Sequence, residues 1–458
     1  MCGIAGIVNL KDPGSVDGAL VERMCDAIAH RGPDDSGFHI TDGVGLGHRR
    51  LSIIDLAGGM QPMSNEDQSI VVTFNGEIYN YQKLRQELEA AGYRFRTQSD
   101  TEVLIHGWQE WGEQCVERLN GMFAYALWDA RKQCVFLARD RLGIKPLYFA
   151  LLPSGALIFA SELKALLVHP ELPRDLDCRA VEDYMALGYV PEPRTILTAA
   201  SKLEPGHVLL LNRGRYIGAN PRQYWDLPCV PHDEMAGDDE LGEELMRLLG
   251  VSVRRRMIAD VPLGAFLSGG VDSSAVVSTM SELSPSPVLT CSISFTEDSH
   301  DESAYAERVS RQYGTDHYSQ EVAADDFDLI DGLATVYDEP YADSSAIPTY
   351  RVCEIARRKV KVALSGDGAD ESFAGYRRHR WHCHEESVRR RLPAAFRRSF
   401  FGALASVYPK LDWAPSFLRA KTTLNGLSLD PVEAYLESVS RCSTRLRNAL
   451  YTQKFKDE

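Results

Sequence analysis

The second residue of the chain is a cysteine, and it is the residue whose position most clearly indicates a catalytic role. The sequence begins Met-Cys-Gly-Ile-Ala-Gly, so removal of Met1 would make Cys2 the N-terminal residue. The Cys2 thiol would then be a nucleophile, and the α-amino group of the same residue, with a reference pKa of about 8, would serve as its general base. The alternative is that Cys2 is only a small apolar residue at the start of a strand. The residues that follow favour the nucleophile.

Four polar motifs follow Cys2 in the first part of the chain. They read His-Arg-Gly-Pro-Asp-Asp at 30–35, His-Arg-Arg-Leu-Ser-Ile at 48–53, Phe-Asn-Gly-Glu-Ile-Tyr-Asn at 74–80 and Ser-Asp-Thr-Glu at 99–102. In this order behind a cysteine at the second position, they resemble the class II glutamine amidotransferases. The glutaminase domain of that family belongs to the N-terminal nucleophile hydrolases, so the resemblance implies that Cys2 hydrolyses glutamine.

Glutamine hydrolysis needs residues that hold both charges of the amino acid. A fixed cation would bind the α-carboxylate of glutamine, and carboxylates would bind its α-ammonium group. Arg50 meets the first need, and Asp100 with Glu77 meets the second. On its own, Arg50 would be a solvated surface charge, and Asp100 would be the N-cap of a helix over residues 101–108. The match to the family at both positions favours ligand roles.

The tetrahedral intermediate of glutamine hydrolysis needs hydrogen-bond donors aimed at its oxyanion. Asn75, through its side chain, and Gly76, through its backbone N–H, are the natural pair. An Asn-Gly dipeptide between apolar runs is also typical of a tight type I′ hairpin turn. Both interpretations stay open, because a turn is one way to present a backbone donor.

Composition indicates an enzyme with more than one domain. At about 150 residues per domain, the 458 residues allow two or three domains. The net charge of −15 argues against nucleic acid or an anionic membrane as a partner. No apolar run approaches the roughly 20 residues of a membrane span, and the first residues do not show a basic segment followed by an apolar stretch. We therefore expect a cytoplasmic protein.

The ten cysteines form no C-x-x-C pair, which favours reduced thiols over a disulfide framework. One cluster has metal-binding residue types, namely His379, His382, Cys383 and His384. Helical spacing would bring only His379 close to His382 and Cys383, with His384 on another face. We therefore expect no metal site in this cluster.

The first half of the chain, residues 1–212, is predicted to be rich in short strands. Residues 123–128 and 134–138 are apolar runs around a polar turn, which indicates a hairpin. A helix is expected over residues 81–91, with Leu84 and Leu88 on one face and Asn80 as its cap. We expect an N-terminal nucleophile hydrolase sandwich, in which two sheets are flanked by helices (αββα). Residues 213–237 are rich in Gly, Pro and acidic residues and are predicted to be a linker.

The second half, residues 238–458, alternates helices with short apolar strands. Residues 240–253 have leucines at helical spacing, and residues 265–267, 289–295 and 360–364 are predicted to be strands. This alternation predicts a Rossmann-like parallel α/β domain, so the chain combines α+β and α/β parts. Ligands of parallel sheets bind at the carboxyl ends of the strands. Polar motifs follow the first and the third strand at those ends.

The motif after the first strand, Ser-Gly-Gly-Val-Asp-Ser-Ser, has the properties of a phosphate cradle. Its glycines let backbone N–H groups approach an anion, its hydroxyls add donors, and the helix expected from about Ser274 adds its positive end. The chain has no Walker A motif. The motif resembles the pyrophosphate loop of ATP pyrophosphatases, and the alternative is a glycine turn with a serine N-cap. The predicted ATP ligands in this motif are Ser268, Gly269, Gly270, Asp272, Ser273 and Ser274. Asp272 and Asp370 are candidate Mg²⁺ ligands, since Mg²⁺ prefers carboxylates together with phosphate oxygens.

A pyrophosphate loop behind a class II glutaminase resembles the glutamine-hydrolysing asparagine synthetases. Residues 189–193, 202–207 and 338–345 add matches, and the resemblance covers the chain to about Arg380. It implies that an internal passage carries ammonia from Cys2 to the second domain, where ATP and Mg²⁺ convert the β-carboxylate of aspartate to an acyl adenylate. Ammonia then gives asparagine, AMP and pyrophosphate. By the same resemblance, Leu267, Ile293, Ser365 and Gly366 contact ATP. Asp367 stands where the family often has glutamate, and we expect its carboxylate to assist adenylate formation.

The resemblance implies the small-molecule substrates glutamine, aspartate and ATP, and the assembly to test is a homodimer. Adenylation of a different carboxylate would leave the same sequence signals, so the acceptor stays open. A β-lactam-forming synthetase would usually lack the N-terminal cysteine, so the presence of Cys2 argues against that class of enzyme. The family's synthetase domain continues beyond the end of this chain, and we find no lysine to hold the departing pyrophosphate. A second expectation is therefore a chain that hydrolyses glutamine and makes little or no asparagine.

Overall fold

The computed structural model of the chain describes residues 1–215, 218–228, 237–295, 302–322, 329–409, 413 and 420–457. These residues form two units, each described separately below. The first unit comprises Met1–Asp177, Pro191–Glu339 and Ser344–Ser365. The second comprises Cys178–Val190, Pro340–Asp343 and Gly366–Glu458.

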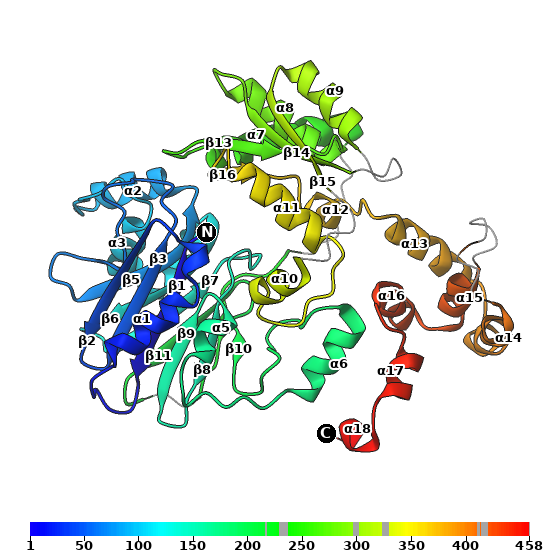
Figure 1. The fold of residues 1–458 in the computed structure, drawn as a ribbon, viewed down its shortest axis with the longest axis horizontal. Helices are drawn as coiled ribbons and strands as arrows, with labels where there is room; N and C mark the ends of the chain where they lie inside the picture. The colour runs from blue at the N-terminus through cyan, green and yellow to red at the C-terminus, as the bar shows by residue number, and fades with distance from the viewer. Residues whose placement is uncertain are drawn as a thin grey trace. The chain divides into compact units, whose positions relative to one another are not determined.

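Cys2 lies immediately before β1 (Gly3–Asn9), a central strand of a six-stranded antiparallel sheet. On one side β1 pairs with β3 (Val44–Arg50), and on the other with β9 (Ala156–Ala160). The full strand order is β10-β8-β9-β1-β3-β2, with β2 (Asp35–Thr41), β8 (Tyr148–Leu151) and β10 (Ser201–Lys202) as the outer strands. Figure 1 shows α1 (Gly18–Asp26) lying along β1 and β3, drawn in blue. Cys2, the predicted nucleophile, thus stands at the start of a strand that is held from both sides.

A second six-stranded antiparallel sheet carries two of the four predicted glutamine-binding residues, Asn75 and Glu77, on one of its strands. Its strand order is β12-β11-β7-β6-β5-β4. The strands are β4 (Met63–Ser64), β5 (Ile70–Ile78), β6 (Gly121–Asp129), β7 (Cys134–Arg139), β11 (His207–Asn212) and β12 (Arg222–Gln223). The predicted hairpin is confirmed, because β6 pairs antiparallel with β7 from Ala124 opposite Arg139 to Asp129 opposite Cys134.

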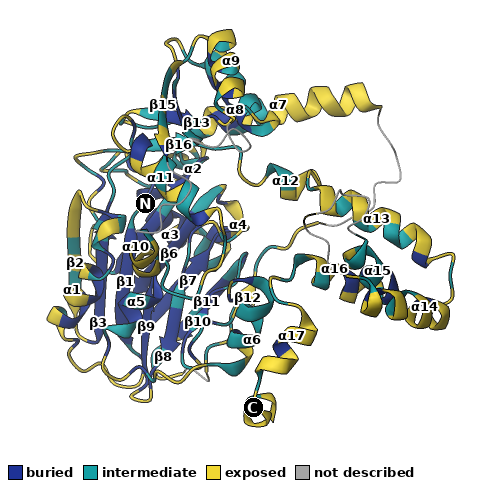
Figure 2. Ribbon diagram, turned by 45° about the vertical axis from the view of Figure 1, so that its right-hand side comes forward, coloured by how far each residue is buried: buried dark blue, intermediate teal, exposed yellow. Residues whose placement is uncertain are grey.

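Three apolar clusters define the layers of this part of the fold. The central cluster joins the two sheets, with Ile4 and Leu46 from one sheet packed among Val71 and Leu137 from the other. The outer face of the first sheet packs against α1 and α5 (Leu163–Leu167), and the outer face of the second packs against α2 (Tyr81–Ala90) and α3 (Glu102–Trp111). Figure 2 shows the strands of these sheets mostly as buried. The predicted αββα sandwich of the N-terminal nucleophile hydrolases is confirmed.

The helix predicted over residues 81–91 is α2, and Leu84 and Leu88 are buried as its spacing indicates. Asn80 is the N-cap residue, but its side chain does not cap the helix. Its Oδ1 accepts a hydrogen bond from the Asn120 backbone N–H (2.9 Å), and its Nδ2 donates to the Arg118 carbonyl oxygen (3.0 Å). The Asn80 side chain therefore ties α2 to the start of β6.

The second half of the chain contributes a four-stranded parallel sheet with the order β15-β14-β13-β16. The strands are β13 (Leu263–Phe266), β14 (Leu289–Phe295), β15 (Asp316–Val322) and β16 (Val362–Leu364). Between them run α8 (Val271–Leu283), α9 (Ser303–Tyr313), α10 (Ile330–Val336) and α11 (Ala346–Ala356), and α7 (Asp238–Arg256) precedes the sheet. The predicted parallel α/β arrangement is confirmed.

Two details of this half differ from the sequence expectation. Leu267 follows β13 instead of ending it, and it is fully buried while its backbone N–H donates to the Cys291 carbonyl oxygen (2.9 Å). On α7, Leu249 and Val253 join the apolar core, whereas Leu241 and Leu245 are 55% and 43% exposed. Helical spacing predicted α7 correctly, but it did not predict how many of the leucines on its apolar face are buried.

The second unit consists of helices in its described residues. They are α6 (Cys178–Leu187), α12 (Ala369–Ser372), α13 (Arg377–Arg389), α14 (Ala394–Val407), α15 (Lys421–Ser428), α16 (Pro431–Val439), α17 (Thr444–Leu450) and α18 (Gln453–Asp457). Buried arginines join them: Arg389 of α13 donates to the Gly426 carbonyl oxygen (3.0 Å) in α15, and Arg447 of α17 pairs with Glu182 of α6 (2.9 Å). Polar contacts therefore supplement a modest apolar core here.

The predicted boundaries at residues 212 and 238 stay a prediction. Residues 216–217 and 229–236 of the predicted linker lie outside the described residues. No helix among the described residues is long and apolar enough to cross a membrane. Within the same residues, no three His, Cys, Asp or Glu side chains gather as they would to hold a metal ion. In α13, the rings of His379 and His382 pack edge-on against those of Tyr376 and Tyr435 instead.

Candidate active site

A cavity of about 290 Å³ in the first unit contains the residues predicted for glutamine hydrolysis. It lies between the start of β1, the end of β5 and the segment before α3, and β16 contributes a further wall. All six predicted glutaminase residues line it, namely Cys2, Arg50, Asn75, Gly76, Glu77 and Asp100. Residues far apart in the sequence thus come together, as the motif series predicts.

Cys2 is held at its thiol and at its backbone. Its Sγ lies 3.4 Å from the Leu51 backbone nitrogen and 3.6 Å from the Leu51 carbonyl oxygen. Arg31 Nε donates to the Cys2 carbonyl oxygen (2.9 Å). Burial raises the pKa of the Cys2 thiol, while the hydrogen bond from Leu51 and the nearby amino group oppose the rise. A thiol in this environment needs a base to take its proton.

The same cavity favours an uncharged amine. The α-amino group at the start of this chain belongs to Met1, and burial lowers its pKa from 8.0 to about 5. Met1 also lines the cavity and therefore occupies space beside the thiol. An amino group on Cys2, exposed by removal of Met1, would lie closer to Sγ. A neutral amine next to the thiol is the form that a general base requires.

Asn75 and Gly76 are not in a turn, so that interpretation is wrong. Both lie within β5, where Asn75 is opposite Ala124 and Gly76 opposite Phe123 of β6. An added Cβ at Gly76 would come within 2.2 Å of the Met122 carbonyl oxygen, so the close approach of β6 requires glycine. Gly76 allows the close approach of β6, and its backbone N–H and the Asn75 side chain remain candidate hydrogen-bond donors.

The Asn75 side chain is the unusual feature of the cavity. It is fully buried, and neither its Oδ1 nor its Nδ2 has a hydrogen-bond partner among the described residues. Buried amides nearly always have partners, and leaving one unsatisfied costs about 1–3 kcal/mol. An unpartnered amide beside a nucleophile is available to a ligand, and its Nδ2 can donate to an oxyanion.

Two buried carboxylates lie in the same cavity. Glu77 is 7% exposed and Asp100 is 5% exposed. Burial, with the charge of Asp100 added, raises the pKa of Glu77 to about 7, and burial raises the pKa of Asp100 to about 6. Asp100 Oδ2 accepts from the Ile78 backbone N–H (2.9 Å), and the N-cap of α3 is Thr101, so Asp100 is not a helix cap. Two like charges that are hard to bury favour a bound cation such as the ammonium group of an amino acid.

Arg50 is 5% exposed, so it is not a solvated surface charge. Its guanidinium donates to the carbonyl oxygens of Asp55 (2.6 Å) and Leu56 (3.0 Å), and thus fixes the loop at residues 51–59. Asp260, between α7 and β13, bonds to the same loop: it accepts from the Asp55 N–H (2.8 Å), and its own N–H donates to Ile53 (2.9 Å). The predicted role of Arg50, binding a carboxylate, stays a prediction.

Two charged residues near Cys2 were missed in the sequence. Lys145 is 3% exposed, and burial lowers its pKa to about 8, against the opposing charge of Glu77. Its Nζ lies 2.9 Å from the Met1 sulfur. Arg31 was part of a matched motif but had no assigned role. The signal for Lys145 was a lysine inside the Ile-Lys-Pro-Leu run before β8.

The predicted phosphate loop follows β13 at its carboxyl end. Gly269 has a φ of +82°, and an added Cβ would lie 2.5 Å from the Tyr305 Cβ, so only glycine fits. The Ser268 hydroxyl lies 3.0 Å from that of Ser273, which closes the loop on itself. The following helix, α8, begins at Val271, three residues earlier than the sequence indicated. Its N-terminus and the loop N–H groups suit a phosphate.

The remaining predicted nucleotide contacts lie on neighbouring strands. Ile293 is on β14, beyond Cys291, which pairs with the last residue of β13, and Ser365 directly follows β16. Gly366, Asp367 and Asp370 belong to the second unit. Asp272 is a half-buried carboxylate in the first turn of α8, the kind of oxygen ligand that Mg²⁺ prefers. Its pairing with Asp370 stays a prediction, as do the roles of Asp367 and Gly366.

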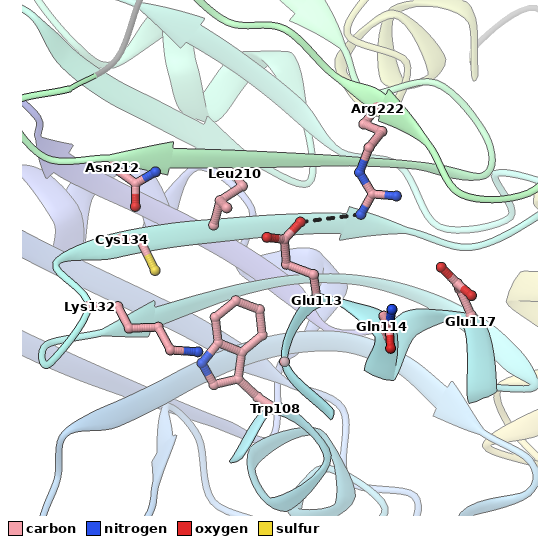
Figure 3. Close-up of a pocket in the computed structure, with 10 residues that line it drawn as sticks. Trp108, Glu113, Gln114, Glu117, Lys132, Cys134, Leu210, Asn212 and Arg222 are labelled. Atoms are coloured by element: carbon pink, nitrogen blue, oxygen red, sulfur yellow. Dashed lines mark hydrogen bonds and ion pairs between the residues drawn. The ribbon is translucent and has the colours of Figure 1, made fainter. Parts of the chain in front are cut away.

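A larger cavity of about 510 Å³ lies elsewhere in the first unit, and Figure 3 shows the residues that line it. None of the predicted site residues is among them. Two of its charged groups have partners: Arg222 pairs with Glu113 (3.2 Å), and Lys132 Nζ lies 4.7 Å from the centre of the Trp108 ring. The smaller cavity, with an unpartnered amide beside a thiol, is therefore the candidate active site.

Comparison with known proteins agrees with this geometry. The family described as "Glutamine amidotransferase domain" matches residues 1–225, and the family described as "Asparagine synthase" matches residues 244–453. Asparagine synthetase (glutamine-hydrolyzing) 1 of Bacillus subtilis is 39% identical over 384 residues, which cover 83% of this chain and 60% of that protein. A protein of Methanocaldococcus jannaschii assigned to the same enzymes is 37% identical over 468 residues, covering 97% of this chain and 88% of its own length. The chain belongs to the glutamine-hydrolysing asparagine synthetase family.

Two further points follow from the comparisons. The asparagine synthase match extends to residue 453, well beyond Arg380, where the sequence resemblance was expected to end. The chain spans 60% and 63% of the lengths of two Bacillus subtilis relatives. Among solved structures, Bacillus subtilis glutamine phosphoribosylpyrophosphate amidotransferase matches at 16% identity with a TM-score of 0.37, covering 69% of this chain and 90% of that one. At that score the likeness carries no argument, and the fold assignment rests on the sheet order.

Replacing Asn75 tests the oxyanion role. Asn75→Ala should lower kcat for glutamine hydrolysis by about 10²- to 10³-fold with a smaller change in KM, because the lost donor acts in the transition state. Steady-state glutamate release measures both constants. Asn120→Ala, in an exposed loop of the same domain, is the matched control. A kcat that stays within about threefold of the unaltered chain would contradict the role.

Glu77 should make glutamine binding depend on pH. With a pKa of about 7, Glu77 is mostly ionised at pH 8 and mostly protonated at pH 6, so its attraction for an ammonium group is lost as the pH falls. KM for glutamine should rise about tenfold between pH 8 and pH 6. Glu77→Gln should show a high KM at both values, whereas Glu89→Gln, on the exposed face of α2, should keep the original profile. A flat KM in the unaltered chain would be the opposite result.

Proposed function

We propose that this chain amidates L-aspartate to L-asparagine with ammonia released from L-glutamine, at the expense of ATP. The observation that carries the proposal is the buried cavity in which an unpartnered Asn75 amide and two carboxylates lie beside Cys2. The family membership and the phosphate-type loop after β13 support the second half of the reaction. The products are asparagine, AMP, pyrophosphate and glutamate.

In the first reaction, Cys2 attacks the side-chain carbonyl carbon of glutamine. The neutral α-amino group of Cys2 takes the thiol proton and passes it to the leaving ammonia. The Asn75 Nδ2 and the Gly76 N–H stabilise the oxyanion of the tetrahedral intermediate. Water then hydrolyses the thioester and releases glutamate. Arg50 holds the α-carboxylate of glutamine, and Glu77 with Asp100 holds its α-ammonium group.

In the second reaction, the phosphate loop binds ATP through its backbone N–H groups and the N-terminus of α8. Leu267, Ile293, Ser365 and Gly366 line the rest of the nucleotide site. Mg²⁺, held by Asp272 and Asp370, would neutralise charge on the phosphates. The aspartate β-carboxylate displaces pyrophosphate to form an acyl adenylate, with Asp367 as the assisting carboxylate. Ammonia then displaces AMP.

One short strand connects the two reactions. Lys361, Val362 and Ala363 line the glutamine cavity, and Ser365, a proposed ATP contact, follows the same three-residue strand. Lys361 also pairs with Asp34 (2.6 Å), and the Asp34 carboxylate accepts a hydrogen bond from the Ser52 N–H (2.8 Å) of the loop beside Cys2. A passage for ammonia between the two reactions would therefore run along β16.

The relatives favour this reaction over the alternatives. The relatives that are 39% and 37% identical to the chain carry the name of glutamine-hydrolysing asparagine synthetases, which favours aspartate over another carboxylate acceptor. They do not favour the glutaminase-only alternative that the chain length suggested. We further propose a cytoplasmic location. We also propose a homodimeric assembly, whose molar mass size-exclusion chromatography with light scattering would measure.

Two substitutions should separate the two reactions. Cys2→Ala should abolish glutamine-dependent asparagine formation and leave ammonium-dependent formation, because only the nucleophile is lost. Asp272→Asn should lower both syntheses by at least about tenfold and leave glutamate release intact, because a Mg²⁺ ligand is lost. Mass spectrometry would quantify asparagine and glutamate.

The exposed variant Asp239→Asn is the control for a charge change in the second half. Glutamate release by Cys2→Ala would show that another group is the nucleophile. Unchanged asparagine synthesis in Asp272→Asn would show that Asp272 has no role as a Mg²⁺ ligand and serves only the first turn of α8.

A further inference from the structure

The segment at residues 338–345, matched to the family by its sequence, has no part in the steps above. Its first two residues, Asp338 and Glu339, follow α10 and belong to the second half of the sequence. Both nevertheless form ion pairs with lysines of the N-terminal sandwich, within the first unit. Their side chains are 6% and 11% exposed, so these are buried contacts.

Asp338 pairs with Lys164 at the start of α5. Lys164 Nζ lies 2.9 Å from Asp338 Oδ1 and 3.0 Å from Glu162 Oε2, so it bridges two carboxylates. The Lys164 backbone N–H also donates to Asp338 Oδ2 (2.9 Å), and its Nζ donates to the Thr335 carbonyl oxygen (2.7 Å). Asp338 and the end of α10 are thus fixed to one lysine of the glutaminase domain.

The chain of contacts continues from Glu162 to the nucleophile. Arg31 Nη1 lies 2.6 Å from Glu162 Oε1, and Arg31 Nε donates to the Cys2 carbonyl oxygen (2.9 Å). Burial works to raise the pKa of Glu162, but bonds from His30, Arg31 and Lys164 outweigh it and lower the pKa to about 2. The carboxylate is therefore ionised at neutral pH, and four alternating charges connect Asp338 with the backbone of Cys2.

Glu339 makes a parallel contact with a different lysine of the same domain. Its Oε2 lies 2.5 Å from Lys202 Nζ, and its Oε1 accepts from the Ile196 N–H (2.7 Å). Lys202 is on β10, at the edge of the sheet that has β1 near its centre. The two acidic residues thus bind the same domain through two lysines, and the contacts of Lys164 continue through Glu162 and Arg31 to the Cys2 backbone.

We propose that Asp338 is a positioning residue for the glutaminase reaction: acting through Lys164, Glu162 and Arg31, it sets the position of the Cys2 backbone. A buried ion pair that loses one partner leaves a charge that must find another, so Lys164 and Arg31 would shift when Asp338 is neutralised. The thiol and amino group of Cys2 would shift with the carbonyl that Arg31 holds. The proposal rests on glutamine hydrolysis by Cys2, the first half of the proposed function.

The test compares variants of the full chain in glutamine hydrolysis without ATP or aspartate. Asp338→Asn keeps the side-chain shape, Lys164→Met keeps the stem length, and both remove the charge. Each should lower kcat by about tenfold with KM within about twofold, since misplacement of a reacting group lowers the rate more than binding. Lys164→Arg, which keeps the charge, should retain most of the rate. Lys202→Met is the matched control and should leave kcat unchanged within about twofold.

The melting temperature of each variant completes the test. If Lys202→Met lowers kcat as much as Asp338→Asn does, docking of the whole segment matters and the proposed link to Cys2 is overturned. Unchanged kcat in Asp338→Asn and Lys164→Met overturns it too, as does a fall in kcat matched by an equal fall in stability for every variant. An unaltered chain without glutamine hydrolysis would refute the proposed function itself, whereas failure to make asparagine alone would leave this test valid.

Discussion

The burial of polar groups around Cys2 is the constraint on which the rest of the structure depends. An amide without partners, two carboxylates and a lysine share one cavity with the thiol, and each of these groups opposes folding when buried unpaired. Only a rigid frame can keep them there. The frame is the central apolar layer between two six-stranded sheets, with β1 and β5 carrying Cys2 and Asn75 at its edge. Substrate binding would give these groups the hydrogen bonds and opposite charges that the free protein lacks. The cost of burying them is then offset when the substrate binds.

The glutaminase cavity also depends on residues from the second half of the sequence. Lys361 and its neighbours form one wall, Asp260 holds the loop beside Cys2, and Asp338 reaches Arg31 through Lys164. Asp260 lies before β13, whereas Asp338 and Lys361 both lie in the connection between β15 and β16. A change in that sheet on nucleotide binding would therefore have more than one physical route to Cys2, through ion pairs and hydrogen bonds.

The sequence predicted the layers and the main residues of the site, because both leave local signals. Alternating apolar strands indicated the sandwich, and the motifs at Arg50, Asn75, Glu77 and Asp100 all reached one cavity. Its errors came from tertiary packing. A turn was one of the two interpretations of Asn75 and Gly76, and pairing with β6 excludes it by keeping both residues in a strand. Glu162 carries no local pattern and Lys145 only its place within an apolar run, since their roles arise only when distant loops meet. The predicted Mg²⁺ pair, Asp272 with Asp370, depends on two parts of the chain that fold as separate units.

The central claim is that Cys2, as the N-terminal residue, is the nucleophile. Treating the active protein with a chloroketone analogue of glutamine, followed by peptide mass spectrometry, tests this most directly. The account predicts an N-terminal peptide that begins at Cys2, lacks Met1 and carries one adduct on Sγ, with glutamine protecting against the reaction. Retention of Met1 in active protein, or an adduct on any other of the ten cysteines with loss of activity, would contradict it.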